Sequence, residues 1–337
     1  MSIDNKTYDV IILSYEPSDK IVHSIEMLIK QDIAPTKIII CNTDEKLLYN
    51  NISDKTKFRD LVENKTINNS LTKIELINIK KEEFDHGRTR NYAAKFSNSD
   101  YILFLTDDAV PFDERLSSRL MEAFEIYGDV KSKVAGAFAK QIANADAPLK
   151  EKLIREYNYP DYDVIKEKLK EQELGIKNYF FSNVCAMYDR DIFNKLNGFE
   201  EDIILNEDTF YAYFAIEKGY KIVYKSDALV YHSHNYNYAM QFSRNFDIGV
   251  SQSMKHEIFD SIPSEKEGTK LLKYVLPRLI KGCHFITAID FLIECVYRYN
   301  GFKCGRRYNS LSINDCIRYS NNKDYFRKMK KDVKRVD

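Results

Sequence analysis

The sequence reads Tyr-Ile-Leu-Phe-Leu-Thr-Asp-Asp at residues 101–108, and this stretch decides the fold class. A short apolar run bounded by polar residues is typical of a strand that is buried on both faces of a sheet. The two aspartates follow directly, at the edge where α/β sheets bind their ligands. The stretch therefore predicts a buried strand of an α/β sheet with carboxylates at its ligand edge.

Three apolar runs precede this strand, and helical patterns with one apolar face separate them. The predicted strands cover residues 8–14, 36–41 and 74–79, and the predicted helices cover 18–31, 55–63 and 88–96. Ser18 is expected to cap the first helix. Strands and helices that alternate in this way predict a parallel sheet with right-handed crossovers.

The second half of the chain mixes strands with helices and ends in helices. The predicted helices cover residues 113–127 and 206–218, and the predicted strands cover 134–139, 179–187, 221–224 and 229–232. Residues 144–177 are charged, tyrosine-rich and weakly periodic, and the pattern is helical from Tyr238 onward. We expect one mixed α/β domain over residues 1–255 and a basic helical region over 256–337.

The charges are unevenly distributed along the chain. The 337 residues carry 51 Lys and Arg against 51 Asp and Glu, a net charge of zero. Residues 270–337 hold 16 basic and 6 acidic side chains, a net charge of +10, so residues 1–269 carry −10. A basic tail on an acidic body indicates an anionic partner surface.

Several classes of site are excluded by the spacing of glycine and cysteine. The 11 glycines include no G-x-G pair and no P-loop, which excludes the dinucleotide fingerprint and P-loop phosphoryl transfer. The only two glycines four residues apart are Gly301 and Gly305, with no serine between them, so there is no nucleophile elbow. No two of the 6 cysteines form a C-x-x-C pair, which indicates reduced thiols.

The ends of the chain favour a cytoplasmic protein. The first nine residues are polar and run directly into a strand, so no signal peptide is expected. The longest uncharged stretch in the apolar C-terminal part is 282–289, which is far too short to span a bilayer.

Two acidic pairs are candidates for chemistry. Asp107 and Asp108 end a strand, where a divalent cation could bridge them to phosphate oxygens. The alternative is a solvated turn, with Asp108 near the start of the helix after Pro111. Glu207 and Asp208 open another helix, although the helix dipole favours acidic residues there in any case.

Two further groups of residues could bind a metal ion or a phosphate group. His232 and His234 stand two apart on a predicted strand and therefore face the same way, although such pairs are more often ordinary surface residues. Residues 84–91 enter a helix and carry Arg88 and Arg90, both good anion partners, but they also fit a charged glycine turn.

The chain carries, in order, the blocks Y-D-V-I-I-L-S-Y, F-D-H-G-R-T-R-N, I-L-F-L-T-D-D-A, N-E-D and V-Y-H-S-H. Together they resemble the rhamnosyltransferase-like branch of glycosyltransferase family 2, and the agreement extends to F-S-N-V-C, L-N-G-F, F-D-I-G-V and G-R-R-Y. The resemblance implies a GT-A fold with a Rossmann-like mixed sheet. It divides the first domain into a nucleotide-binding half, 1–110, and an acceptor half, 111–255.

The resemblance also implies a role for each candidate residue. Ser14, Tyr15 and Glu16 would border the base and ribose, with Asn42 where the family often has an aspartate, and Arg90, Asn91 and Asp107 would complete the nucleotide-sugar site. Thr106 stands in place of the first aspartate of the D-x-D motif, so Asp108 inherits the metal role, with His232 or its rival His234. Asp208 falls at the position of the general base of an inverting transfer, which needs one carboxylate beside the acceptor hydroxyl.

The activity that the resemblance implies is transfer of a sugar, L-rhamnose from dTDP-rhamnose, to a cell-surface polysaccharide or a lipid-linked oligosaccharide, with Mn²⁺ or Mg²⁺. The alternatives are a UDP-hexose donor and a non-catalytic binding protein. A sugar nucleotidyltransferase is disfavoured because no glycine-rich basic loop follows the first strand. No nucleic-acid partner is expected.

Two surface predictions complete the set. Tyr157, Tyr159 and Tyr162 are expected over the acceptor half, where aromatic faces can pack on sugar rings, unless they merely cover a helix. Residues 270–337 are expected to lie against an anionic leaflet at the inner face of the membrane, because charges interrupt their apolar stretch. The alternative is that the apolar face packs on the acceptor half.

Overall fold

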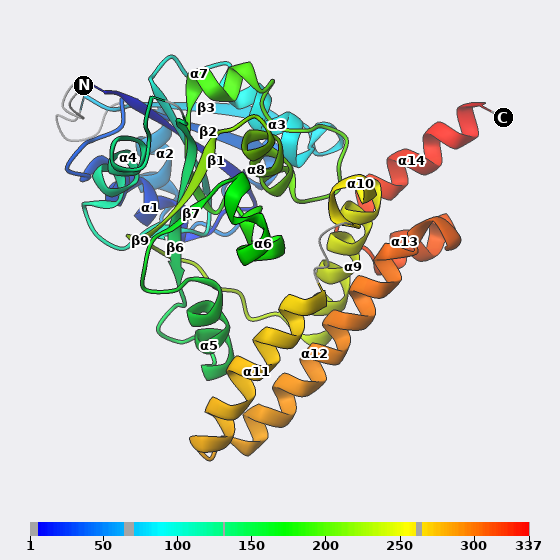
Figure 1. Cartoon of the computed structure of the whole chain (residues 1–337). Helices are drawn as coiled ribbons and strands as arrows, with labels where there is room; N and C mark the ends of the chain where they lie inside the picture. Colours follow the sequence, from blue (N-terminus) through cyan, green and yellow to red (C-terminus); the bar gives the residue numbers. More distant parts are fainter. Residues whose placement is uncertain (1–5, 64–70, 131, 261–264, 337) are drawn as a thin grey trace. The chain divides into compact units, whose positions relative to one another are not determined.

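The computed structural model describes residues 6–63, 71–130, 132–260 and 265–336. The chain divides into two compact units, each assembled from separate segments. Unit 1 consists of Met1–Asn144, Tyr159–Glu201 and Glu207–Ser233. Unit 2 consists of Ala145–Asn158, Asp202–Asn206 and His234–Asp337. Figure 1 shows the elements of both units in sequence colours.

Unit 1 is built on one mixed sheet with the strand order β3-β2-β1-β4-β8-β6-β9-β5, and β7 pairs with β9. The strands are β1 (Tyr8–Tyr15), β2 (Lys37–Thr43), β3 (Lys73–Ile79), β4 (Tyr101–Thr106), β5 (Val110–Pro111), β6 (Val134–Ile142), β7 (Val164–Lys166), β8 (Cys185–Asp189) and β9 (Lys221–Tyr231). The first four strands in chain order pair in parallel, and β8 then joins β4 and β6 in antiparallel pairs. The predicted α/β fold with a Rossmann-like mixed sheet is confirmed.

The sheet is covered by helices whose apolar faces make the core. Ile21, Ile25 and Leu28 of the first helix are fully buried, at the helical spacing that the sequence showed. The helices of unit 1 are α1 (Asp19–Ile29), α2 (Lys55–Glu63), α3 (His86–Ala94), α4 (Leu116–Ile126), α6 (Glu171–Leu174), α7 (Arg190–Lys195) and α8 (Glu207–Glu217). Short 3₁₀ turns cover Glu45–Leu47, Lys81–Glu83, Lys168–Lys170 and Gly175–Asn178.

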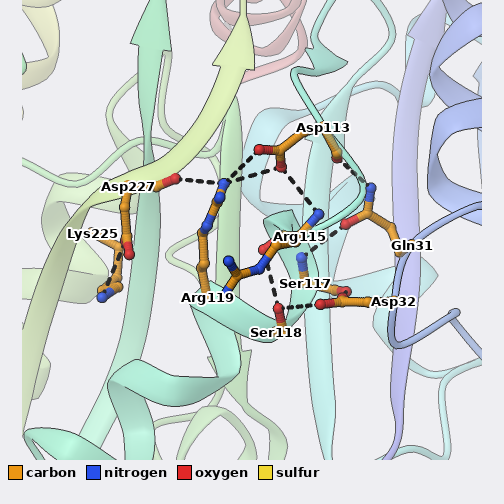
Figure 2. Close-up of polar contacts among 9 residues, drawn as sticks. All are labelled: Gln31, Asp32, Asp113, Arg115, Ser117, Ser118, Arg119, Lys225 and Asp227. Carbon is orange, nitrogen blue, oxygen red and sulfur yellow. Dashed lines mark hydrogen bonds and ion pairs between the residues drawn. The ribbon is translucent and has the colours of Figure 1, made fainter.

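Polar contacts anchor the start of α4, as Figure 2 shows. The N–H of Ser117 donates to Oε1 of Gln31 at 3.0 Å, which satisfies one of the orphan donors of the helix start from another element. The Arg119 guanidinium pairs with Asp113 at 2.8 Å and donates to the carbonyl of Asp227 at 2.9 Å. These contacts tie α4 to the segment after α1 and to β9.

Several predicted elements are corrected by the structure. The strand expected over 179–187 begins only at Cys185, and buried aromatic side chains at Tyr179 and Phe181 account for the misleading apolar run. The two short strands expected at 221–224 and 229–232 form one strand, β9. Ser18 stands at the start of α1 but makes no side-chain capping bond.

Unit 2 is helical. Its helices are α5 (Leu149–Asn158), α9 (Tyr238–Met254), α10 (His256–Phe259), α11 (Glu265–Lys281), α12 (Phe285–Arg306), α13 (Ile313–Tyr319) and α14 (Lys323–Val336), with a 3₁₀ turn at Tyr308–Ser310. Figure 1 shows α11 and α12 side by side as an antiparallel hairpin. No helix within the described ranges has both the length and the apolar character to cross a membrane.

Helices α9 and α12 pack with their backbones in close approach. A Cβ on Gly301 would lie 2.3 Å from the carbonyl oxygen of Phe242, and one on Gly305 would lie 2.0 Å from that of Phe246. Only glycine leaves room for such a contact. Because α9 packs in unit 2 with the C-terminal helices, this compact unit includes residues before the predicted boundary at 255/256.

Candidate active site

The carboxyl ends of β1, β2 and β4 gather the polar residues that the sequence singled out. Ser14 stands opposite Asn42 in the parallel register of β1 and β2, and Leu13 stands opposite Thr106 in that of β1 and β4. The backbone N–H of Tyr15 donates to Oδ2 of Asp107 at 3.0 Å. Three strands thus end together, as parallel pairing requires.

Asn42 leaves a polar atom unsatisfied at this edge. Its side chain is fully buried, and its Nδ2 donates to Oδ1 of Asn78 on β3 at 2.9 Å. Its Oδ1 has no hydrogen-bond partner among the described residues. A buried acceptor without a partner costs stability, so it points to a ligand donor at this position.

Tyr15 and Glu16 form the exposed rim of the same edge. The ammonium of Lys81 donates to the Tyr15 hydroxyl at 2.8 Å and lies 5.0 Å from the centre of its ring. Glu16 has φ = 50°, a left-handed conformation that costs energy in any residue but glycine. Such strain at a ligand edge is typical of a functional turn.

Asp107 is strongly affected by its surroundings. Burial raises the pKa of its carboxyl to about 6, and the neighbouring charge of Asp108 acts in the same direction, against the hydrogen bond from Tyr15. Asp107 and Asp108 lie in a turn, as the alternative interpretation expects, but β5 separates Asp108 from α4, which begins only at Leu116.

Asp108 and two histidines form a candidate metal site. Oδ2 of Asp108 lies 3.5 Å from Nε2 of His232, the residue that follows β9. His234 comes two residues later, and one ligand atom from each of the three lies within 4.8 Å of the others. Two imidazole nitrogens and one carboxylate oxygen at this spacing suit a divalent transition metal ion such as Mn²⁺.

Gln141 sets the orientation of His232. Nδ1 of His232 lies 2.8 Å from Oε1 of Gln141, and Nε2 of Gln141 donates to the hydroxyl of Ser182 at 2.9 Å. Since an amide oxygen only accepts, Nδ1 of His232 carries a proton, and Nε2 is the ring nitrogen that faces Asp108. This is the arrangement in which a histidine ligates a metal.

Glu207 and Asp208 open α8 in different environments. Glu207 is buried, pairs with Arg90 at 2.9 Å and accepts from Nδ2 of Asn183 at 3.0 Å. The Asp208 carboxylate is half-buried and accepts from the backbone N–H groups of Asn183, at 3.1 Å, and Thr209, at 2.7 Å.

These contacts push the two acids apart in pKa. Burial and the neighbouring charge of Glu207 raise the pKa of Asp208 to about 7, against its two backbone hydrogen bonds. Burial opposes ionisation of Glu207, but the charge of Arg90, together with His86 and the hydrogen bond from Asn183, outweighs burial and lowers the pKa of that carboxyl. A carboxyl with a pKa near 7 beside a carboxyl that stays ionised is typical of a site that transfers protons.

Arg90 and Asn91 have structural partners in the described structure. The guanidinium of Arg90 is almost fully buried against Glu207 and the carbonyl of His86. The Asn91 amide holds the 198–201 turn: it accepts from the N–H of Phe199 at 2.8 Å and donates to the carbonyl of the same residue. These contacts favour a structural role for Asn91, and its nucleotide contact stays a prediction.

The three tyrosines expected over an acceptor have different surroundings. Tyr159 is only 4% exposed and packs against Phe180 and Tyr224, so the prediction is wrong for this residue. Tyr157 donates to Glu267 and packs on Tyr274 within unit 2. Tyr162 is exposed and remains a candidate.

Sequence reasoning did not assign the residues that support the site. Asn183 bonds both Asp208 and Glu207, and its Oδ1 accepts from the hydroxyl of Tyr188 at 2.5 Å. Gln141 orients His232 from β6. Asn183 lies inside the F-S-N-V-C block, which supports the family resemblance but does not indicate a role for this residue. No sequence pattern points to Gln141.

Comparison with known proteins gives concordant results. The model of glycosyl transferase family 2 matches residues 9–196. The O-antigen chain rhamnosyltransferase RfbN of Salmonella typhimurium is 31% identical over 319 residues, 94% of this chain and 95% of that protein. The O-antigen chain rhamnosyltransferase WbaN of Salmonella anatum is 36% identical over 253 residues, 74% of this chain and 78% of that protein.

A solved structure shares the fold. The mannosyltransferase PcManGT of Pyrobaculum calidifontis, in complex with GDP-Man and Mn²⁺, is similar with a TM-score of 0.59 at 12% identity. The likeness covers 90% of this chain and 88% of that chain. At this identity it shows a common GT-A fold and no more.

Proposed function

The chain belongs to glycosyltransferase family 2, and from this premise we propose that it transfers L-rhamnose from dTDP-rhamnose to a hydroxyl of a growing O-antigen-type polysaccharide, with inversion at the anomeric carbon. The donor and the acceptor class are supported by the two relatives, both named O-antigen chain rhamnosyltransferases, at 31% and 36% identity. The resemblance implies inversion, and the site fits it because Asp208 is the one carboxylate of the acidic pair that is not ion-paired with Arg90.

The observation that carries the mechanism is the environment of Asp208. An inverting displacement needs one base that removes the proton of the acceptor hydroxyl as the new bond forms. With a pKa of about 7, Asp208 is ionised in a large share of molecules at neutral pH and is still basic enough to accept that proton. Asn183 and Thr209 hold the carboxylate in place through their backbone N–H groups.

Glu207 does not fit the role of a second catalytic carboxylate. It is buried, and its Oε1 is paired with Arg90 and accepts from Asn183. A retaining mechanism through two carboxylates that act as a pair, as in glycosidases, is therefore disfavoured. Glu207 instead fixes the start of α8 and raises the pKa of its neighbour.

The leaving diphosphate belongs at the carboxyl edge of the sheet. Asp108, His232 and His234 would hold a divalent metal ion there, which would stabilise the negative charge that develops on the departing nucleoside diphosphate. Ser14, Tyr15, Glu16 and Asn42 would border the base and ribose, and the unsatisfied Oδ1 of Asn42 would accept one donor from them. Asp107 fixes the end of β1 through Tyr15.

A donor screen tests this proposal. Purified protein with Mn²⁺ and a rhamnose-accepting glycan is offered dTDP-rhamnose and the common UDP- and GDP-sugars, and nucleoside diphosphate release is measured. We expect the fastest release with dTDP-rhamnose, with the opposite anomeric configuration in the product by NMR. Faster turnover of a UDP-hexose would replace the donor, and no turnover of any nucleotide sugar would favour a binding protein.

A further inference from the structure

The acidic residues that interrupt the apolar stretch of α12 pair with cations within unit 2. Glu294 is only 2% exposed and contacts Lys150 at 2.7 Å, Arg298 at 2.5 Å and Nε2 of Gln241 at 3.0 Å. The Asp290 side chain is 36% exposed and pairs with the same Lys150 at 2.5 Å. Glu294 is therefore withdrawn from the face of the helix opposite to the packed side, and the charge of Asp290 is neutralised at its edge.

That opposite face is apolar and exposed. It consists of Phe285, Ile286, Ile289, Leu292, Ile293 and Val296, which we call the α12 apolar face. Ile286 is 86% exposed and Ile289 is 60% exposed. Spacings of three and four residues place these side chains along one side of the helix. A contiguous apolar face of this kind marks an interaction surface.

The neighbouring helix, α11, carries exposed cations. Among the side chains that the structure describes on α11 and α12, every exposed charge is positive: Lys270, Lys273, Arg278 and Lys281. Residues 270–337 as a whole carry 16 basic and 6 acidic side chains. The α11–α12 hairpin thus exposes an apolar face on α12 and only positive charge on α11, and we call these α11 cations the positive rim.

This charge pattern decides between two occupants. A second copy of the chain would bring the same positive rims together in a two-fold interface, which repels them. An anionic lipid surface would meet the rim with opposite charge and accept the apolar side chains at the headgroup boundary. We propose that the α12 apolar face docks on an anionic lipid bilayer, with α12 in the plane of the interface.

Vesicle flotation with the full chain tests this without any donor or turnover, so its outcome is separate from that of the proposed activity. Vesicles of phosphatidylcholine with phosphatidylglycerol are compared with phosphatidylcholine alone. We expect binding to the anionic vesicles at low salt, weaker binding to the neutral ones, and release as salt rises. If the folded protein ignores anionic vesicles at low salt, the proposal is wrong.

Matched variants locate the surface. The double variant Ile286→Asp/Ile289→Asp should weaken vesicle binding by about tenfold or more, because it places negative charge where the helix would contact the apolar part of the lipid layer. Its control is Leu169→Asp, a residue of unit 1 that is 89% exposed, which should bind as the parent does. Thermal unfolding by circular dichroism confirms that both variants are folded.

The positive rim is tested in the same way. Lys273→Glu/Lys281→Glu should reduce anionic-vesicle binding and its salt dependence, whereas Lys195→Glu/Lys218→Glu, which changes the net charge equally on exposed residues of unit 1, should not. Equal losses from both pairs would show attraction by net charge alone and overturn the proposal. So would a dimer in sedimentation velocity that Ile286→Asp/Ile289→Asp dissociates.

Discussion

Asp208 and Glu207 are adjacent in the sequence, yet the fold shifts their pKa values in opposite directions. The difference comes from one long-range partner, Arg90, which pairs with Glu207 and leaves Asp208 to the backbone N–H groups of Asn183 and Thr209. The motif pointed to Asp208 as the base. Its raised pKa could not be predicted, because it comes first from burial, which depends on how the rest of the chain packs around the start of α8.

The role of Asp208 is tested by Asp208→Asn. The amide cannot take a proton, so kcat should fall by about 10²–10⁴-fold, while the dissociation constant of the nucleotide sugar stays nearly unchanged. Steady-state kinetics and calorimetric donor titration measure the two effects. Activity within threefold of the parent would leave Asp208 as a helix-start carboxylate only.

The pKa of Asp208 predicts the pH dependence of the reaction. The base must be ionised, so kcat/KM should rise as pH increases through about 7 and then level off. Stability should run the other way. The folded pKa exceeds the ordinary aspartate value of 3.8, so the folded state binds more protons, and the stability contribution is lost as pH rises towards about 7. The free energy of unfolding of Asp208→Asn, relative to the parent, should therefore increase over this window.

Gln141 acts through His232 and is a positioning residue. Gln141→Leu removes the acceptor that keeps the proton on Nδ1, so the affinity for Mn²⁺ should fall by about 10–100-fold in calorimetric titration without donor. Gln141→Glu keeps an acceptor at the same distance and should restore the affinity. Unchanged affinity in Gln141→Leu would show that His232 needs no partner, or that it is not a ligand.

At the scale of the elements, apolar runs predicted strands well where the strand is central and parallel. The predicted strand over 101–106 coincides with β4. Helices with one apolar face were also predicted well, since the helix predicted near 55–63 coincides with α2. The pattern failed at 179–184, where aromatic side chains fill the core without joining a ladder, and at β5, whose two residues are too few to show a period.

In the sequence, the G-x-x-x-G spacing at Gly301 and Gly305 served only to exclude a nucleophile elbow. In the structure, the same two glycines mark the contact between α12 and α9. Both glycines lie against backbone carbonyls of α9, an approach that small residues four apart allow on one helix face. The spacing was visible. Its partner helix was not.

Gly305→Ala tests this contact. Helix propensity alone would make alanine stabilising by about 1 kcal/mol, but its Cβ would lie 2.0 Å from the carbonyl oxygen of Phe246. The helices must separate, so we expect a net loss of about 2 kcal/mol or more in urea unfolding. Gly268→Ala in α11, where a Cβ meets nothing within 4 Å, is the matched control and should stabilise. A stabilised Gly305→Ala would contradict the close packing.

For the whole molecule, the sequence predicted the family, the fold class and the acidic sheet edge, but not how the chain divides. Residues 145–158 leave the sheet unit to pack as α5 against α11 and α12, and the chain then returns to unit 1. The composition changes near residue 144, but no linker marks the crossings, and nothing in the pattern marks the return at 158/159. What decides them is apolar burial between segments far apart in sequence, such as Leu153 with Val275 and Phe291.

The metal site depends on the same long-range assembly, since Asp108 follows β4 and His232 follows β9. Exhaustive chelation with EDTA should therefore abolish sugar transfer, and Mn²⁺ should restore it at least as well as Mg²⁺, because imidazole ligands favour the softer ion.

Binding of Mn²⁺ to the folded state alone should also stabilise the protein, by about 2.7 kcal/mol at a hundredfold excess of the ion over Kd. The rise in melting temperature with Mn²⁺ should disappear in His232→Ala and persist in His256→Ala, an exposed histidine of α10. Full activity after chelation, or an equal rise in melting temperature in both variants, would assign Asp108 and His232 to structural roles.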